Sequence, residues 1–353
     1  MPLEDVYKMR FIGFRDYFVG IFFLFFIATQ AFATSLQREN IPFFDPSASQ
    51  IIPFSIQKNF KNGSLKYRFL KDLKSYFGIE IFVETGTNLG NTTAKASGIF
   101  TEVHTIELFP EFYSLALEKF KTNSNVHVYF GSSEHLLPSI LPLCQQPTLF
   151  YLDGHYDGGD RSGKGEKNTP ILEELAAIQA WGRTDAVIVI DDVCDFQESL
   201  YSDRIQQTCF ADYPDLKQIV ESVLAINPQY QICFIPNALL IFPPSPGVTV
   251  SPLLSACTID RFSVFSPLFS EQELLFVEKT IGGIQGSERK ELQDYFQAYA
   301  KFEWSLGWRS FAGLWMGLIL SHDQKRSEAQ QIFKQTKQSA IPGWRVDVYI
   351  VPS

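Results

Sequence analysis

The chain has 353 residues, long enough for one large domain or two of ordinary size. It carries 30 Lys and Arg against 39 Asp and Glu, a formal net charge of −9. This balance argues against nucleic acid as a partner, because nucleic-acid-binding chains are usually basic. The five cysteines lie far apart without a C-x-x-C pair, which argues against zinc or thioredoxin-type sites and favours reduced, structural cysteines.

The N-terminal part contains a long apolar run, Tyr17–Ala33, that no charge interrupts. Lys8 and Arg15 precede it, and residues 31–33 form a small-x-small pattern. This layout is typical of a secretory signal peptide, although a membrane anchor or a buried helix fits the same run. We therefore expect residues 1–34 to be a signal peptide or an anchor, with membrane association through this segment.

Residues 35–64 contain several prolines among polar residues and are predicted to be a linker or a covering segment. Beyond them, apolar strand patterns alternate with helical patterns. The expected strands are Glu80–Glu84, Val103–Glu107, Val126–Phe130, Thr148–Asp153, Ala186–Asp191, Tyr230–Ile235 and Ala238–Phe242. The expected helices are Leu65–Phe77, Asn91–Ser97, Pro110–Lys121, Glu134–Leu141, Pro170–Trp181 and Asp215–Ile226, with Pro110 and Pro170 in first turns.

This alternation predicts an α/β fold, a Rossmann-like doubly wound sheet that is mostly parallel. Only Pro236 and Asn237 separate the last two strands, so the sheet should end in an antiparallel hairpin strand. We assign residues 65–245 to this domain because a cluster of prolines follows it. Residues 246–353 form a helical C-terminal region, whose last two helices (Phe311–Ser321 and Ser327–Ser339) resemble a helical hairpin; Glu271–Thr280 and Glu288–Phe302 are also expected to be helical.

A glycine-containing stretch, IEIFVETGTNLGN, spans the first of these strands and the turn after it. An apolar run ends at Glu84, and a turn with Gly86 and Gly90 leads into a helix. Such a turn lets a ligand approach the backbone, and the helix presents free N–H groups to it. Thr85 and Thr87 belong to the same candidate ligand loop, although a plain strand-to-helix turn has the same pattern.

Acids stand at the carboxyl ends of four expected strands: Glu84, Glu107, Asp153 and Asp191, the last followed by Asp192. Ligands of open α/β sheets bind outside these ends. Glu107 lies 23 residues after Glu84, about where an acid accepts hydrogen bonds from ribose hydroxyls, or it caps the helix at Pro110. Ser132 and Ser133 follow the third strand, where they border an adenine or serve as the N-cap of the next helix.

The three aspartates would repel one another unless a divalent cation neutralised them, which predicts a magnesium site at Asp153, Asp191 and Asp192. Alternatively, one of them pairs with a basic residue of the following loop. His155 lies two residues after Asp153 and is a candidate base, or simply a hydrogen-bonded loop histidine. The glycine-rich loop His155–Asn168 is long enough to act as a lid.

The motifs VETGTNLGNT, TIEL, YFGSSEHL, LFYLDGHYDGG and VIVIDDV resemble those of class I S-adenosylmethionine-dependent methyltransferases over roughly Lys66–Phe242. The pairing of LDGHY with IDD is similar to magnesium-dependent, macrocin-type sugar O-methyltransferases. The resemblance implies that Glu84, Gly86 and Gly90 shape the methionine end of the cofactor site, and that Glu107 holds the ribose. It assigns magnesium to the three aspartates. His155 departs from the family pattern, which has an acid there.

The resemblance therefore implies metal-assisted O-methylation, with S-adenosylmethionine and Mg²⁺ as cofactors and a hydroxylated, sugar-like small molecule as acceptor. A homo-oligomer is compatible with this interpretation. Two alternatives remain: a metal-dependent nucleotide-sugar transferase, and a non-catalytic binding module of the same fold. The location stays open between an exported protein and a membrane-anchored one, with the catalytic domain in the cytosol if the donor is drawn from there.

Overall fold

The computed structural model describes residues 50–52, 65–156, 163–192, 196, 212–235, 238–250, 289–290, 293–294, 313 and 316–339. The apolar run Tyr17–Ala33 and the expected helix Glu271–Thr280 lie outside these residues. Among the described residues, no helix has the length and apolar character needed to cross a membrane.

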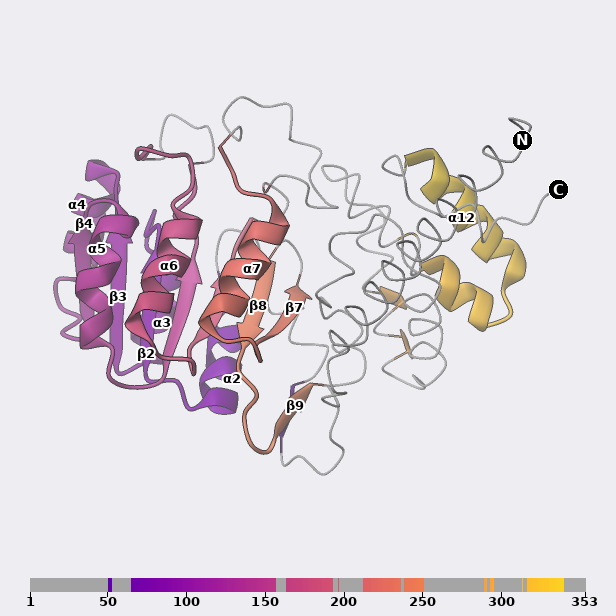
Figure 1. Cartoon of the computed structure of the whole chain (residues 1–353), viewed down its shortest axis with the longest axis horizontal. Helices are drawn as coiled ribbons and strands as arrows, with labels where there is room; N and C mark the ends of the chain where they lie inside the picture. The colour runs from indigo at the N-terminus through magenta and orange to yellow at the C-terminus, as the bar shows by residue number, and fades with distance from the viewer. Residues whose placement is uncertain are drawn as a thin grey trace, which may run out of the picture. The chain divides into compact units, whose positions relative to one another are not determined.

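A seven-stranded sheet is the centre of the fold (Figure 1), in the order β4-β3-β2-β5-β6-β8-β7. Its strands are β2 (Ile81–Thr85), β3 (Glu102–Glu107), β4 (Val126–Phe130), β5 (Thr148–Leu152), β6 (Val187–Ile190), β7 (Gln231–Ile235) and β8 (Ala238–Phe242). All neighbours pair in parallel except β8, which is antiparallel to both β6 and β7. A mostly parallel, doubly wound sheet with an antiparallel hairpin strand at one end is the predicted Rossmann-like fold class, which is therefore confirmed.

Helices cover both faces of the sheet. They are α2 (Tyr67–Phe77), α3 (Asn91–Ser97), α4 (Pro110–Phe120), α5 (Ser133–Ile140), α6 (Ile171–Trp181) and α7 (Leu216–Ile226). Helices α5, α6 and α7 lie side by side on one face, and α2 and α3 cover the other (Figure 1). The continuous apolar runs of the central strands are buried on both faces, as expected for parallel strands.

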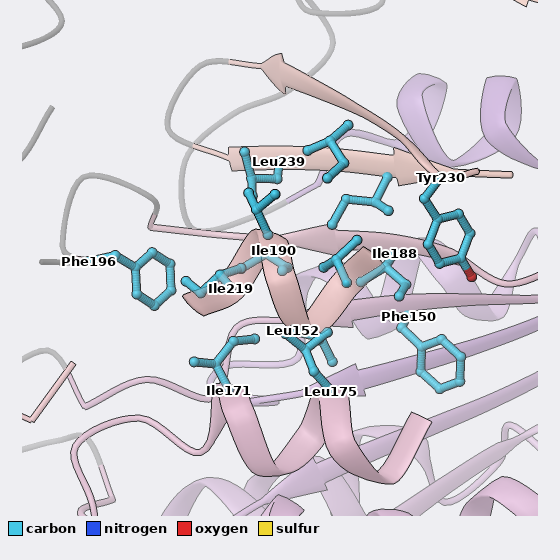
Figure 2. Close-up of a cluster of buried hydrophobic side chains, with 14 of the residues drawn as sticks. Phe150, Leu152, Ile171, Leu175, Ile188, Ile190, Phe196, Ile219, Tyr230 and Leu239 are labelled. Carbon is cyan, nitrogen blue, oxygen red and sulfur yellow. The ribbon is translucent and has the colours of Figure 1, made fainter. Parts of the chain in front are cut away.

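The largest hydrophobic cluster lies between the sheet and the α5–α7 layer. Figure 2 shows Leu152 of β5 and Ile190 of β6 in this layer, with Ile171 and Leu175 of α6 pointing toward them. Ile219 brings α7 into the same cluster. Burial of each such side chain stabilises the fold by about 1.5–3 kcal/mol. This layer therefore holds β5 and β6 firmly against α6 and α7.

The predicted elements are present with small shifts at their ends. Val126–Phe130, Ala238–Phe242 and Asn91–Ser97 have the predicted bounds. Pro110 lies in the first turn of α4 as expected. The first-turn assignment of Pro170 is wrong, because this residue is the N-cap of α6 with ψ 8°. The hydroxyl of Thr169 accepts a hydrogen bond from the Ile171 N–H at 3.3 Å, so the helix begins at Ile171.

One small sheet was not expected. Strand β1 (Gln50–Ile52) lies in the predicted linker and pairs in parallel with β9 (Val248–Val250), beyond the proline-rich boundary. In the C-terminal region, α12 (Arg326–Ser339) packs against the helix 316–322. The Phe333 ring of α12 lies so close to Gly317 that a Cβ there would overlap it. This pair of helices is the expected helical hairpin.

Candidate functional site

A cleft of about 370 Å³ lies at the carboxyl ends of β2, β3 and β5, where the strand order reverses. This volume is within the range of small-molecule sites, and the position is where open α/β sheets bind ligands. Most of the predicted site residues line it: Glu84, Gly86, Thr87, Glu107, Ser132, Ser133, Asp153, His155 and Asp192. Thr85, Gly90 and Asp191 do not line the cleft but lie directly behind its walls.

The loop after β2 is joined tightly to the chain after β5. The Asp153 N–H lies 3.2 Å from both the carbonyl and the hydroxyl oxygen of Thr85. Gly86 has φ +82°, and a Cβ there would overlap the carbonyl oxygen of Asp153. Thr85 therefore locks the two loops together, and only glycine fits at position 86.

Gly90 positions the helix that follows the loop. It is the N-cap of α3 with φ +64°, and a Cβ there would lie 2.9 Å from the Phe120 ring. The Lys119 ammonium donates to the carbonyl oxygens of Leu89 at 2.7 Å and Gly90 at 2.9 Å. Because α4 holds this turn from outside, Gly90 shapes the site without lining it.

Glu107, the last residue of β3, connects two walls of the cleft. Its carboxylate accepts the backbone N–H groups of Asn88 and Phe109, each at 2.7 Å. Burial raises the pKa of Glu107, and the backbone N–H groups oppose this effect. The backbone N–H groups of Leu108 and Thr87 also act on this carboxylate, so the loop after β2 and the loop after β3 both hold it at the cleft.

Glu84 is buried near the end of β2 within a group of threonines. Its carboxylate accepts the hydroxyl of Thr93 and, at 2.9 Å, that of Thr105. The Thr105 hydroxyl is also 2.5 Å from the hydroxyl of Thr87, which lines the cleft. Burial raises the pKa of Glu84 to about 7, so this carboxyl binds a proton near neutral pH.

Ser132 is the N-cap residue of α5, but its hydroxyl makes no capping hydrogen bond. The Ser132 Oγ is buried and has no partner among the described residues. Ser132 therefore occupies the N-cap position of α5, but its hydroxyl does not cap the helix. Ser133, the first residue of α5, is buried and also lines the cleft.

Glu174 is a buried acid that the sequence analysis missed. It stands in the first turn of α6 beside Glu173, where acids usually face solvent and stabilise the helix dipole. Instead it is fully buried, and neither carboxyl oxygen has a hydrogen bond of good geometry among the described residues. Burial raises its pKa to about 7, although the nearby Ser133 and Thr85 hydroxyls lower it. Helical spacing is the signal that could have found it, because position 174 falls on the same face of α6 as Ile171, Leu175 and Ile178.

The three predicted magnesium ligands differ in their surroundings. Asp153 and Asp192 line the cleft, whereas Asp191 is completely buried behind it. Burial raises the pKa of Asp153 well above its ordinary value, and the charges of Asp191 and Asp192 add to this. Among the described residues, no three His, Cys, Asp or Glu side chains form a group suited to a metal ion. The magnesium site therefore stays a prediction.

His155 lines the cleft beside Asp153. Its Nδ1 is 2.9 Å from the hydroxyl of Thr169, and its Nε2 is buried without a hydrogen-bond partner among the described residues. The ring packs edge-on against Phe196, with centroids 5.5 Å apart. Burial lowers the pKa of His155 to about 4, so the imidazole is neutral at neutral pH.

The described part of the loop after His155 borders the mouth of the cleft. The Tyr156 N–H donates to the Asn168 carbonyl at 2.7 Å, which closes the base of the loop. Asn168 is in turn held by Asp212, whose carboxylate accepts its backbone N–H at 2.9 Å. A Cβ on Gly163 would lie 3.0 Å from the side chain of Leu108, across the cleft. The lid function of this loop stays a prediction.

Comparison with known proteins finds only distant likenesses. No protein-family model and no curated protein matches the chain. A putative O-methyltransferase from Klebsiella pneumoniae is 14% identical over 61% of this chain and 96% of its own, with a TM-score of 0.37. An O-methyltransferase from Bacillus cereus in complex with SAH is 16% identical over 50% and 80%, with a TM-score of 0.36. These are likenesses of fold, and the fold assignment rests on the strand order of the chain itself.

Proposed function

We propose that the chain is an S-adenosylmethionine-dependent methyltransferase. The observation that carries this proposal is the cleft at the reversal of strand order, which Gly86 and Glu107 both line. The Glu107 carboxylate suits the two ribose hydroxyls of the cofactor as donors. The unpartnered hydroxyl of Ser132 offers a further hydrogen bond to the adenosine.

The charges of the cleft favour a cationic ligand. Among the residues that the structure describes, the acidic lining residues are Glu84, Glu107, Glu134, Asp153 and Asp192, and the basic one is Lys167. Lys167 already pairs with Glu173. S-adenosylmethionine carries a sulfonium and an ammonium group, whereas the diphosphate of a nucleotide sugar would meet mainly carboxylates. This balance supports the methyltransferase over the nucleotide-sugar transferase.

The acceptor that we propose is a hydroxylated, sugar-like small molecule, methylated on oxygen. A base removes the hydroxyl proton, and the oxygen then attacks the methyl carbon while the carbon–sulfur bond breaks. The sequence pattern assigns the base to His155. Burial lowers the pKa of His155, which makes it a weak base. Asp153 lines the cleft beside it and is the alternative base, acting as an ionised carboxylate that holds no metal ion.

Magnesium would assist this reaction by stabilising the developing alkoxide. Magnesium keeps several waters and binds through one or two carboxylates, which suits Asp153 and Asp192 at the cleft. In that arrangement Asp153 would hold the ion, and His155 would be the base.

Isothermal titration calorimetry with S-adenosylhomocysteine and with a nucleoside-diphosphate sugar, each with and without Mg²⁺, tests the proposal. We expect saturable binding of S-adenosylhomocysteine that Glu107→Ala weakens. Binding of the diphosphate sugar alone would support the rival transferase, and binding of neither would reject both enzymes. Transfer of a labelled methyl group to a panel of sugars and polyols then identifies the acceptor. Donor binding without transfer to any acceptor would support the non-catalytic module.

A further inference from the structure

A buried tyrosine contacts the acid that follows β6. Tyr151 lies in β5 with no exposed surface, and its hydroxyl donates to Asp191 Oδ2 at 2.5 Å. Asp191 is also fully buried, and its N–H donates to the Leu152 carbonyl at 3.1 Å, which continues the β5–β6 pairing. The Asp191 carboxylate is therefore fixed from inside the sheet.

The other oxygen of this carboxylate holds the next residue. Asp191 Oδ1 accepts the backbone N–H of Asp192 at 2.8 Å. Asp192 has φ +53°, a left-handed conformation that is uncommon outside glycine and that aspartate and asparagine adopt more readily than other residues. Such conformations persist where surrounding contacts enforce them, and they concentrate at functional sites. Asp192 also lines the cleft.

We propose that Tyr151 and Asp191 are positioning residues for the methyl transfer, which hold Asp192 in its left-handed conformation at the cleft beside Asp153. The inference rests on the proposed function. In this role Asp191 acts through its two hydrogen bonds, so its negative charge is not needed for turnover. Asp192 and Asp153 remain the two carboxylates at the acceptor end.

Two substitutions at Asp191 separate this role from that of a metal ligand. In Asp191→Asn, the amide oxygen still accepts the Asp192 N–H and the amide group still faces Tyr151, so we expect kcat to fall much less than in Asp191→Leu. In Asp191→Leu, both hydrogen bonds are lost, and we expect kcat to fall by about 100-fold, as for a misplaced active-site group. S-adenosylhomocysteine affinity should stay unchanged in both. If Asp191→Asn is as inactive as Asp191→Leu, the charge itself is required and the inference is wrong.

Tyr151→Phe provides a milder second variant, because it removes one hydroxyl group and keeps the ring. It removes the hydrogen bond to Asp191 Oδ2, and the hydroxyl's hydrogen bond to the Asp153 carboxyl as well, so kcat should fall while donor affinity is retained. Adding Asp191→Asn removes the charge that the Tyr151 hydroxyl contacted and should restore the part of kcat that was lost through Asp191. A double variant less active than Tyr151→Phe alone would overturn the inference.

Crystal structures of the wild-type protein and of Asp191→Leu test the positioning step without an acceptor. We expect φ at position 192 to become negative in the variant. A left-handed Asp192 that persists without the Asp191 carboxylate would overturn the inference. This result does not depend on the proposed function, whose failure would show separately as absent S-adenosylhomocysteine binding to the wild-type protein.

Discussion

Gly86 and Asp153 approach each other so closely that a single added carbon would not fit between them. A Cβ on Gly86 would overlap the Asp153 carbonyl oxygen and lie 3.0 Å from its carbonyl carbon. Gly86 also has φ +82°, so a side chain is disfavoured by the backbone as well. This contact joins the loops after β2 and β5 where the strand order of the sheet reverses, and both residues line the cleft.

Gly86→Ala should therefore destabilise the protein and weaken donor binding together. We expect a loss of about 2–5 kcal/mol in the free energy of unfolding, from the left-handed backbone and the steric overlap combined. The matched control is Gly182→Ala, since Gly182 has φ +80° but a Cβ there would have no neighbouring atom within 4 Å. It should cost only about 1–2 kcal/mol and leave donor affinity unchanged. Urea unfolding and calorimetry compare the two, and equal losses would contradict the steric account.

Glu107→Ala should reduce both stability and donor affinity. The sequence offered two roles for this carboxylate, the ribose of a ligand or a cap for the helix at Pro110, and it accepts the backbone N–H groups of Asn88 and Phe109. Losing it leaves two partly buried donors unpaired, which costs about 1–3 kcal/mol of unfolding free energy. Binding of S-adenosylhomocysteine should weaken by about 1.5–3 kcal/mol, the range for hydrogen bonds to a charged group.

The control for this variant is Glu118→Ala, because the Glu118 side chain is 73% exposed on α4. It should change neither the urea midpoint nor the calorimetric affinity. Normal donor binding in Glu107→Ala would show that the ribose assignment is wrong.

Glu174→Gln should stabilise the protein at pH 8 and change little at pH 4. Burial raises the pKa of Glu174 from 4.5 to about 7, so the folded state binds this proton more tightly than the unfolded state. Its contribution is fully present below pH 4.5 and is lost as the pH rises through about 7. Glutamine has no proton to lose, so the gain at pH 8 should be on the order of 1–3 kcal/mol.

Urea unfolding from pH 4 to 8 measures this effect. Glu221→Gln, at an exposed position of α7, is the control and should follow the wild-type curve. A Glu174→Gln curve parallel to the wild-type curve would show that Glu174 does not titrate in this range.

The strands and helices could be predicted because burial leaves a regular pattern in the residues that form them. The hairpin of β7 and β8 was visible in two apolar runs separated by two residues. The pairing of β1 with β9 was not, because it joins three-residue strands that are remote in sequence and lack any periodic pattern. Short strands of this kind depend on the fold around them.

The site was predicted in position but not in its internal contacts. Acids at strand ends were enough to place Glu107 and Asp153 at the cleft, since parallel strands end at one edge. The sequence could not show that Asp191 is buried while Asp192 lines the cleft. This difference depends on the left-handed backbone at Asp192, which the sequence does not reveal. Tyr151 gave no signal, since a tyrosine in an apolar run is also what β-strand propensity favours.

His155 should titrate with a pKa of about 4, well below the ordinary value of 6.5. The unfolded state then binds the proton more tightly, so His155 lowers stability as the pH falls from about 6.5 to 4. NMR of the imidazole resonances measures the midpoint, and the signal that disappears in His155→Gln assigns it. A midpoint near the ordinary value would mean that the ring is solvated and available as the base in place of Asp153.

Ser132→Ala should separate binding from stability. The Ser132 hydroxyl is buried without a partner among the described residues, so the folded protein gains nothing from it and bears the cost of its desolvation. Alanine should therefore leave the unfolding midpoint unchanged or raise it. If the hydroxyl contacts the adenosine, S-adenosylhomocysteine affinity should fall by about 0.5–1.5 kcal/mol, the net value of one hydrogen bond. Ser139→Ala is the control, because its exposed hydroxyl donates to the Leu136 carbonyl on the same helix, away from the cleft. Unchanged affinity in Ser132→Ala would exclude this hydroxyl from the cofactor site, whereas a lower midpoint would reveal a protein partner that holds it in the absence of ligand.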